Sequence, residues 1–252
     1  MVPRMTTALP PSAEKPRYVA EMFGRIARRY DLMNTVMTGG MDRAWRRVVA
    51  REALGPHSSE RSPLASAVLD VGTGTGKLAQ AILEAAPTAR VVGVDFTFGM
   101  LRVTPRGLSL AAGDALRLPF PGGQFDAIVS AFVVRNLGDV PQGVREQVRV
   151  LRPGGRMVVL ETTPGPPGLL RPLYRVFFRR IVPLLGRLIA GDGSAYTYLP
   201  ESTLAFLEPA RLADLLRQHG LVDVQVRRLA LGCVAVTSGR KIVNLPTTGG
   251  ME

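Results

Sequence analysis

The chain has 252 residues, of which 46 % are hydrophobic, and it is long enough to build one substantial core. This length and composition exclude a small disulfide scaffold and a disordered tail. The only cysteine, Cys233, has no cysteine or histidine near it in the sequence, so we expect no disulfide, no metal site and a reducing, cytoplasmic setting. Because the sequence offers neither roughly 20 consecutive apolar residues nor a secretory signal, we expect neither an integral membrane protein nor a secreted one.

The formal net charge is +12, from 32 Lys and Arg against 20 Asp and Glu, an excess typical of proteins that bind nucleic acid or anionic membranes. Only three of the basic residues are lysines, and an arginine bias of this kind can also arise from coding composition alone. Residues 1–63 carry +5, residues 64–164 carry +2 and residues 165–252 carry +5. The charge is therefore concentrated in the two ends of the chain.

The N-terminal region predicts two helices. Residues 1–14 contain several prolines and no apolar periodicity, so we expect a flexible leader there. Apolar residues then recur at helical spacing over residues 15–30 while arginines project elsewhere, which predicts an amphipathic helix. A second helix is expected over residues 42–54, after the break at Gly39-Gly40. Together they make residues 15–63 a helical N-terminal lid.

Short β-rich runs alternate with helical stretches through residues 64–164. Strands separated by helices predict a parallel sheet with helices on both faces. The expected strands are Ala67–Val71, Arg90–Val94, Leu108–Ala111, Phe125–Phe132 and Arg156–Glu161, and the expected longer helices are Gly76–Ala85 and Val140–Leu151.

The alternation breaks after Pro164. Residues 165–207 form a helical insertion, in which a long apolar stripe is interrupted by Pro183, where we expect a kink. Residues 208–241 then supply a closing helix, Pro209–Gly220, and two strands, Val222–Leu229 and Gly232–Thr237, before a tail at 242–252. The predicted fold class is thus α/β, one domain over residues 15–241 with a doubly wound, mostly parallel seven-stranded sheet.

The most informative run is a strand that ends in a glycine-rich turn and opens a helix. Gly72, Gly74 and Gly76 let the backbone approach a ligand where a Cβ would collide. Their spacing departs from the dinucleotide pattern G-x-G-x-x-G, because Lys77 stands where its last glycine would be. Asp70, at the end of the strand, suits a cationic group and would repel a pyrophosphate. These features favour S-adenosylmethionine over NAD.

Two more acids follow the next two strands. Asp95 is placed to accept hydrogen bonds from ribose hydroxyls, and Asp114 to accept one from an adenine amino group. A single acid at such a place is often only a helix cap or turn former, but three acids after three successive strands favour a cofactor site. The cofactor candidates are Asp70, Gly72, Thr73, Gly74, Gly76, Asp95, Phe96, Met100, Gly113, Asp114 and Ala115.

These sequence motifs, together with Leu151 to Gly155, resemble those of the Rossmann-like S-adenosylmethionine methyltransferases. More specific motifs resemble those of the ubiquinone/menaquinone biosynthesis C-methyltransferases, the UbiE type, over nearly all of residues 15–241. They are Phe23 to Asn34, Trp45 to Arg47, Leu118 to Phe120, Phe132 to Asn136, Tyr196 to Ser202 and Leu231 to Lys241. The resemblance implies C-methylation of a prenylated quinol, with demethylmenaquinol to menaquinol as the favoured reaction and ubiquinone biosynthesis as the alternative. It also implies a homodimer.

The sequence departs from the family pattern at several positions. Val133 replaces a glycine that usually precedes the Arg-Asn pair, which we expect to reshape the substrate pocket. Asp42 and Thr237 stand where histidine is common, and Pro105 shortens the helix that follows Met100, on the adenosine side.

Methyl transfer from a sulfonium is an in-line displacement, so the protein has to position a nucleophilic carbon and tune its charge. A ring carbon becomes nucleophilic when a neighbouring hydroxyl loses its proton, so a reduced quinol fits and an oxidised quinone does not. Arg135 and Asn136 directly follow the fourth strand, and we predict that Arg135 stabilises the phenolate while Asn136 orients the ring oxygen. The alternative is a structural ion pair between Arg135 and Asp139.

Aromatic and polar residues of the N-terminal lid and the insertion are the candidates for the substrate pocket. Tyr30 is placed with the catalytic residues, and the substrate-binding candidates are Asp31, Asn34, Phe132, Tyr196 and Tyr198. The apolar stripe of residues 169–190 is either an ordinary lid helix or a helix that admits an isoprenoid tail while its arginines meet anionic lipid. The second alternative predicts peripheral contact with the inner face of the cell membrane.

Other functions remain as alternatives. The nearest is a methyltransferase with the same cofactor and another small aromatic or lipid substrate. An RNA methyltransferase would explain the charge, but the chain has neither an Asp/Asn-Pro-Pro-aromatic word after the fourth strand nor a cysteine after a proline, so no nucleic acid is expected. A dinucleotide oxidoreductase conflicts with the glycine spacing, and a noncatalytic accessory subunit would bind cofactor without turnover.

Overall fold

The computed structural model describes residues 9–11, 14–55, 66–166, 168–190 and 195–243. Most of the predicted leader and tail lies outside these residues. Within them no helix is both long and apolar enough to cross a bilayer.

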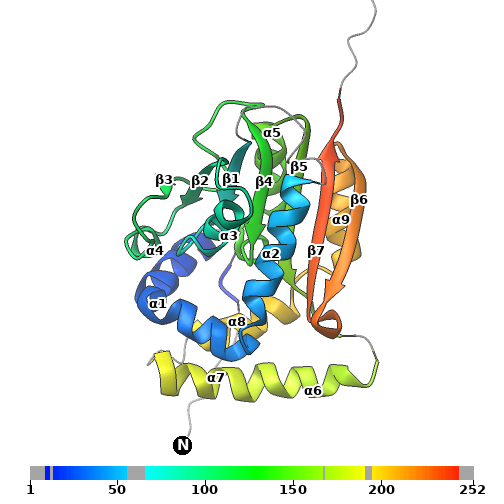
Figure 1. The fold of residues 1–252 in the computed structure, drawn as a ribbon. Coiled ribbons are helices and arrows are strands. Elements are labelled where there is room, and N and C mark those ends of the chain that lie inside the picture. The colour runs from blue at the N-terminus through cyan, green and yellow to red at the C-terminus, as the bar shows by residue number, and fades with distance from the viewer. Residues whose placement is uncertain (1–8, 12–13, 56–65, 167, 191–194, 244–252) are drawn as a thin grey trace, which may run out of the picture.

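A seven-stranded sheet organises the molecule, in the order β3-β2-β1-β4-β5-β7-β6 (Figure 1). All neighbouring strands are parallel except β7, which runs antiparallel to β5 and β6. The strand order reverses between β1 and β4, and ligands of such sheets bind in the crevice at the carboxyl ends of the strands at this point. The predicted doubly wound, mostly parallel sheet is confirmed. The strands are β1 Ala67–Val71, β2 Arg90–Asp95, β3 Ser109–Ala112, β4 Phe125–Ala131, β5 Leu151–Thr162, β6 Leu221–Leu229 and β7 Val234–Lys241.

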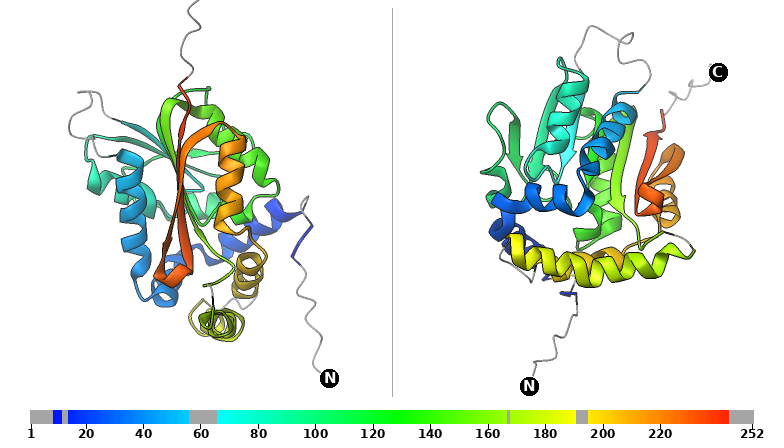
Figure 2. Two further views of the ribbon diagram at one scale, coloured as in Figure 1. Left: turned by 90° about the vertical axis from the view of Figure 1, so that its right-hand side faces the viewer. Right: turned by 60° about the horizontal axis from the view of Figure 1, so that its bottom comes forward.

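Helices cover both faces of the sheet because successive strand residues point to opposite sides. Val68 packs in one core with α2 and α3, whereas its neighbour Leu69 packs in the other with α5 and α9. Figure 2 shows these helices on either side of the strands. Their bounds are α2 Met41–Leu54, α3 Lys77–Ala85, α5 Val140–Val150 and α9 Pro209–Gln218, and the short α4 covers Phe98–Leu101.

The first helix, α1 Lys15–Thr38, is eight residues longer at its C-terminus than the periodicity predicts, so it carries Tyr30, Asp31 and Asn34. It ends at Gly39 and Gly40, whose φ angles of +58° and +79° only glycine adopts readily. α1 crosses the carboxyl end of the sheet and packs against the insertion in a third core. In Figure 1, α1 and the helices of the insertion lie below the sheet.

The predicted helical insertion contains one nearly straight rod of helix (Figure 1) and, later in the chain, helix α8 Ala195–Leu204. The rod consists of α6 Leu170–Val176, η2 Phe177–Ile181, α7 Val182–Leu185 and η3 Gly186–Ala190. The expected kink at Pro183 is absent, because the π-helical turn η2 just before it accommodates a residue that has no N–H to donate. The predicted apolar stripe also faces outward: Leu173 and Leu188 are 68 % and 73 % exposed.

Several strand boundaries differ from the prediction: the last strand, β7, runs from Val234 to Lys241 and not from Gly232 to Thr237, and the boundaries of β4 and β5 bear on the site. β4 ends at Ala131, because Phe132 turns into the left-handed region with φ +62° and the short 3-10 helix η1 Val134–Asn136 follows. β5 begins at Leu151, five residues before the predicted start at Arg156, with a register shift between its pairing to Phe125 and to Ala127. The turn at Phe132 sends the Arg-Asn pair back toward the crevice.

A substitution at Leu160 tests the packing of the central core. The side chain of Leu160 is fully buried in β5, so Leu160→Ala should lower the free energy of unfolding by about 2–5 kcal/mol. Leu169→Ala, at a side chain that is 98 % exposed, should change it by less than about 0.5 kcal/mol. Urea denaturation measures both, and equal losses would contradict the placement of β5 at the centre.

Candidate active site

The glycine-rich turn between β1 and α3 is hydrogen-bonded to the neighbouring strand β2. The backbone N–H groups of Gly72 and Thr73 both donate to the carbonyl of Val94, at 2.7 and 3.0 Å. Gly72, Gly74 and Gly76 have φ angles of +66°, +55° and +79°, so each occupies the region that disfavours a side chain. The turn therefore brings bare backbone to the crevice at the end of β1.

Asp70 is buried at the end of β1, and its Oδ2 accepts hydrogen bonds from Thr73 Oγ1 at 2.7 Å and the N–H of Ala79 at 3.1 Å. Burial raises the pKa of Asp70 to about 7, and the nearby charge of Arg46 offsets only part of that rise. A cationic group bound beside Asp70 would favour its ionised form.

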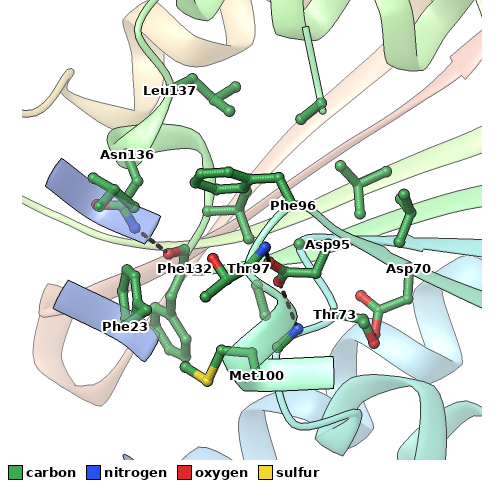
Figure 3. Close-up of a pocket in the computed structure, with 18 of the residues that line it drawn as sticks. Phe23, Asp70, Thr73, Asp95, Phe96, Thr97, Met100, Phe132, Asn136 and Leu137 are labelled. Carbon is green, nitrogen blue, oxygen red and sulfur yellow. Dashed lines mark hydrogen bonds between the residues drawn. The ribbon is translucent and has the colours of Figure 1, made fainter. Parts of the chain in front are cut away.

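Asp95 and Asp114 line the same cleft (Figure 3 shows Asp95 beside Asp70). Asp95 accepts from the N–H of Gly74 at 2.9 Å and from that of Thr97 at 2.8 Å, and burial raises its pKa. Asp114 is exposed, and its Oδ1 accepts from the N–H of Leu116 at 2.9 Å. A carboxylate has about four acceptor positions, so both can still accept from a ligand hydroxyl or amino group.

Ten of the eleven predicted cofactor residues line this cleft, which we name the cofactor cleft. The exception is Gly76: a Cβ there would lie 2.6 Å from Leu108 Cδ1, so this glycine allows the turn to pack against the protein and does not face the cleft. Val133 also lines the cofactor cleft, with Cγ2 2.4 Å from where a Cβ of Gly72 would lie. The departure at Val133 therefore narrows the cofactor side, and the expectation that it reshapes the substrate pocket is wrong.

A second, apolar cavity of about 400 Å³ adjoins the cofactor cleft. The two share the side chains of Phe23, Tyr30 and Phe132, and Figure 3 shows Phe23 and Phe132 at this boundary. The catalytic candidate Tyr30 and four of the substrate-binding candidates line the apolar cavity: Asn34, Phe132, Tyr196 and Tyr198.

Asp31 does not line the apolar cavity. Its Oδ1 accepts a hydrogen bond from Thr75 Oγ1 at 2.7 Å, and its Oδ2 lies 3.7 Å from Lys77 Nζ. Its carboxylate is thus held at the glycine-rich turn and the start of α3, although the adjacent Tyr30 lines the cavity. Asp31 therefore connects α1 to the glycine-rich turn, and its predicted place in the substrate pocket is wrong.

Arg135 lines the apolar cavity and is 5 % exposed. The structural alternative named the wrong partner: Asp139 instead caps α5 by accepting from the N–H of Gln142 at 2.9 Å. Arg135 pairs with the buried carboxylate of Glu161, which also accepts from the Arg135 backbone N–H at 3.2 Å. The Nε of Arg135 has no hydrogen-bond partner among the described residues, so one buried donor of the guanidinium is free for a ligand.

Asn136 faces the cofactor cleft and is held from two sides. Its Nδ2 donates to the carbonyl of Phe132 at 3.1 Å, and its Oδ1 accepts from the hydroxyl of Tyr198 at 3.2 Å. Burial raises the pKa of Tyr198 to about 12, so this hydroxyl keeps its proton and remains a donor. Asn136 and Tyr198 thus join the cleft to the cavity.

Several lining residues escaped the sequence reasoning. Trp45 and Cys233 line the apolar cavity, as do three aromatic residues of the rod, Tyr174, Phe177 and Phe178. Phe177 belonged to the predicted apolar stripe but was not assigned to the pocket, and the only local signal for Tyr174 and Phe178 was their aromatic character between the positions of that stripe. Glu161 had a clearer signal in the sequence, because it is an acid at the end of a run of buried apolar strand residues.

The raised pKa of Asp70 has a measurable consequence for stability. Its pKa is 3.8 without the fold and about 7 within it, so ionising Asp70 costs folding free energy as the pH rises from about 4 to 7. Asp70→Asn should therefore raise the unfolding free energy of the ligand-free protein by at least about 1 kcal/mol at pH 8 and by much less at pH 5. Denaturant titrations at the two pH values measure the difference, and an equal effect at both would contradict it.

Comparison with known proteins places this site in a family. The model of the ubiE/COQ5 methyltransferase family matches residues 12–241. A demethylmenaquinone methyltransferase of Deinococcus radiodurans is 45 % identical over 90 % of this chain and 94 % of its own length. That of Thermus thermophilus is 44 % identical over 86 % and 99 %, and a ubiquinone/menaquinone biosynthesis C-methyltransferase of Desulfotalea psychrophila is 42 % identical over 88 % and 90 %.

Solved structures share the fold at low sequence identity. A SAM-dependent methyltransferase from Thermotoga maritima matches 88 % of this chain and 99 % of its own, with a TM-score of 0.58 and 17 % identity. Human N-acetylserotonin methyltransferase, solved with SAM, matches 89 % of this chain and 59 % of its own, also with a TM-score of 0.58 and 17 % identity. The family match over residues 12–241 and the close relatives together show that the chain belongs to the ubiE/COQ5 family of S-adenosylmethionine-dependent methyltransferases.

Proposed function

We propose that this methyltransferase transfers a methyl group from S-adenosylmethionine to a ring carbon of a prenylated quinol, converting demethylmenaquinol to menaquinol. One observation carries the proposal: an apolar cavity of about 400 Å³ meets the cofactor cleft at Phe132, with Arg135 in its wall. A cavity of this size and polarity suits an aromatic ring with an apolar tail. The names of the relatives from Deinococcus and Thermus agree with this substrate.

The residues of the cofactor cleft fit S-adenosylmethionine. Asp70 would face the cationic amino-acid end, Asp95 would accept from the ribose hydroxyls and Asp114 from the adenine amino group. The space beside the Cα of Gly74 is open, because a Cβ built there would have no heavy atom within 4 Å. When bound, this cofactor supplies an electrophilic methyl group on a sulfonium.

Arg135 and Asn136 would then act on the quinol. The carbon next to a ring hydroxyl becomes nucleophilic as that hydroxyl loses its proton, and a fixed positive charge stabilises the oxyanion. Arg135 supplies the charge and the free Nε donor. Asn136 does not line the apolar cavity, so it would act by positioning Phe132 and Tyr198, which do, through its hydrogen bonds to both. An arginine in a protein stays protonated, so a water molecule takes the proton.

The test of Arg135 replaces its partner Glu161 as well, because a buried carboxylate left without Arg135 would destabilise the fold. Replacing both, Arg135→Gln with Glu161→Gln, should lower kcat on demethylmenaquinol by about 100-fold at saturating cofactor, while the cofactor still binds. The matched control replaces an ion pair of α5 away from the site, Glu146→Gln with Arg149→Gln, and should leave kcat unchanged.

A loss of less than tenfold in a folded double variant would contradict the role of Arg135. Methylation of a soluble phenol with none of demethylmenaquinol would contradict the substrate and favour another small aromatic. Cofactor binding without turnover on any quinol would identify a noncatalytic accessory subunit.

We also propose that the outer face of the rod rests on anionic lipid, where a prenylated substrate resides. Residues 168–190 contain five exposed arginines and no acid, and the side chains of Leu173 and Leu188 between them are exposed. The inner face of the same rod lines the apolar cavity through Tyr174, Phe177 and Phe178. Apolar side chains together with arginines are typical of helices that lie in a membrane interface.

Vesicle sedimentation tests this contact. The protein should sediment with anionic vesicles at low salt and be released by high salt, because the attraction is partly electrostatic. Arg175→Ser with Arg179→Ser should weaken sedimentation, and Arg102→Ser with Arg106→Ser, outside the rod, should not. Sedimentation of equal amounts of protein with neutral and with anionic vesicles would contradict the proposed contact with anionic lipid. The family resemblance also implies a homodimer, so the mass in solution is measured alongside to show whether a second copy covers the rod.

A further inference from the structure

Some polar residues of the apolar cavity have no role in the mechanism described above. Arg135, Thr162 and Tyr198 come from η1, β5 and α8, where the reacting hydroxyl would lie. Asn34, Thr38 and Asp42 come instead from the end of α1 and the start of α2. Burying three polar side chains in an apolar wall is unfavourable unless they have hydrogen-bond partners.

The three residues are connected to one another. Thr38 Oγ1 lies 2.8 Å from the carbonyl oxygen of Asn34 and 3.3 Å from Asp42 Oδ1. The other carboxylate oxygen of Asp42, Oδ2, pairs with Arg46. Oδ1 of Asp42 thus keeps acceptor capacity, because its contact with Thr38 is long and a carboxylate oxygen accepts two hydrogen bonds.

Asn34 supplies the complementary group. Its Nδ2 is buried and has no hydrogen-bond partner among the described residues. An unpaired buried donor costs free energy that a ligand acceptor would recover. A donor on Asn34 and an acceptor on Asp42, in the wall of one cavity, suit a hydroxyl, which donates one hydrogen bond and accepts others.

We propose that Asn34, Thr38 and Asp42 form a second oxygen subsite, which holds the ring hydroxyl remote from the methylated carbon. The inference rests on the proposed function, because a 1,4-quinol carries two hydroxyls on opposite sides of its ring and Arg135 accounts for only one. The remote hydroxyl donates to Asp42 Oδ1 and accepts from Asn34 Nδ2.

The subsite also selects the reduced form of the substrate. Asp42 is the only carboxylate among the described residues that line the cavity, and a quinone oxygen has no proton to donate to it. A carbonyl placed against Asp42 would leave two acceptors facing each other, which disfavours binding. Residues of α1 and α2 thus discriminate between quinol and quinone when the substrate binds, and not in the methyl-transfer step.

The test compares two substrates under anaerobic, reducing conditions: demethylmenaquinol, and the same prenylated naphthol without the remote hydroxyl. Asp42→Asn should raise KM for the quinol by about 10-fold to 100-fold, the range of a charged hydrogen bond, and leave KM for the naphthol unchanged. The same variant should be inhibited more strongly by the oxidised quinone, because an amide can donate to a carbonyl.

Asn34→Leu is the second variant, because Asp42→Asn disturbs the buried pair with Arg46 and can fail to fold. It should raise KM for the quinol alone. Val36→Ala, on α1 but outside both the cavity and the cofactor cleft, should change neither substrate's KM. An equal rise in KM for quinol and naphthol in a folded variant would overturn the subsite, whereas a wild-type protein that methylates neither would overturn the proposed function instead.

Discussion

The short segment after β4, Phe132 to Leu137, is held from several sides, and the rest of the site is arranged around it. The N–H of Phe132 donates to the carbonyl of Leu160 at 2.8 Å, and the buried Glu161 of β5 pairs with Arg135. Lys15, at the start of α1, donates to the carbonyls of Arg135 and Leu137 at 2.8 and 3.1 Å. Sheet, N-terminal helix and insertion thus meet on one turn, and a strained φ at Phe132 persists because its surroundings determine it.

This turn separates two environments that the reaction requires side by side. On one side lie Asp70 and Asp95, acids at strand ends that suit a cationic, hydroxylated cofactor. On the other lies a cavity whose wall is mostly aromatic and aliphatic. Phe132 belongs to both walls, so a methyl group on the cofactor side and a ring carbon on the cavity side would meet across it. The low polarity of this wall strengthens the electrostatic effect of Arg135 there.

Much of the sheet and the cofactor cleft could be predicted from the sequence, because their signals are local. A buried strand, a glycine-rich turn and an acid at the strand end are adjacent in the chain, and parallel strands bring their carboxyl ends to one edge. Partnerships between elements were harder to predict. Glu161 reaches Arg135 only because β4 and β5 are neighbours, and Asp31 turns to Thr75 because α1 continues past its predicted end.

The rod shows a further limit of sequence periodicity. Its apolar stripe is as regular as that of a buried helix, yet Leu173 and Leu188 face outward while Tyr174 and Val182 face inward. Periodicity identifies faces of a helix but not which face is covered, and here both faces are apolar enough to be buried. Under the proposal above, anionic lipid covers the outward face.

Transfer of a labelled methyl group to the two redox forms of one substrate tests the central claim most directly. The wild-type protein, given labelled S-adenosylmethionine and demethylmenaquinone with or without a chemical reductant, should label the ring carbon of the reduced form and leave the oxidised form unlabelled. Equal labelling of both forms would contradict an account in which Arg135 stabilises a phenolate formed from a quinol.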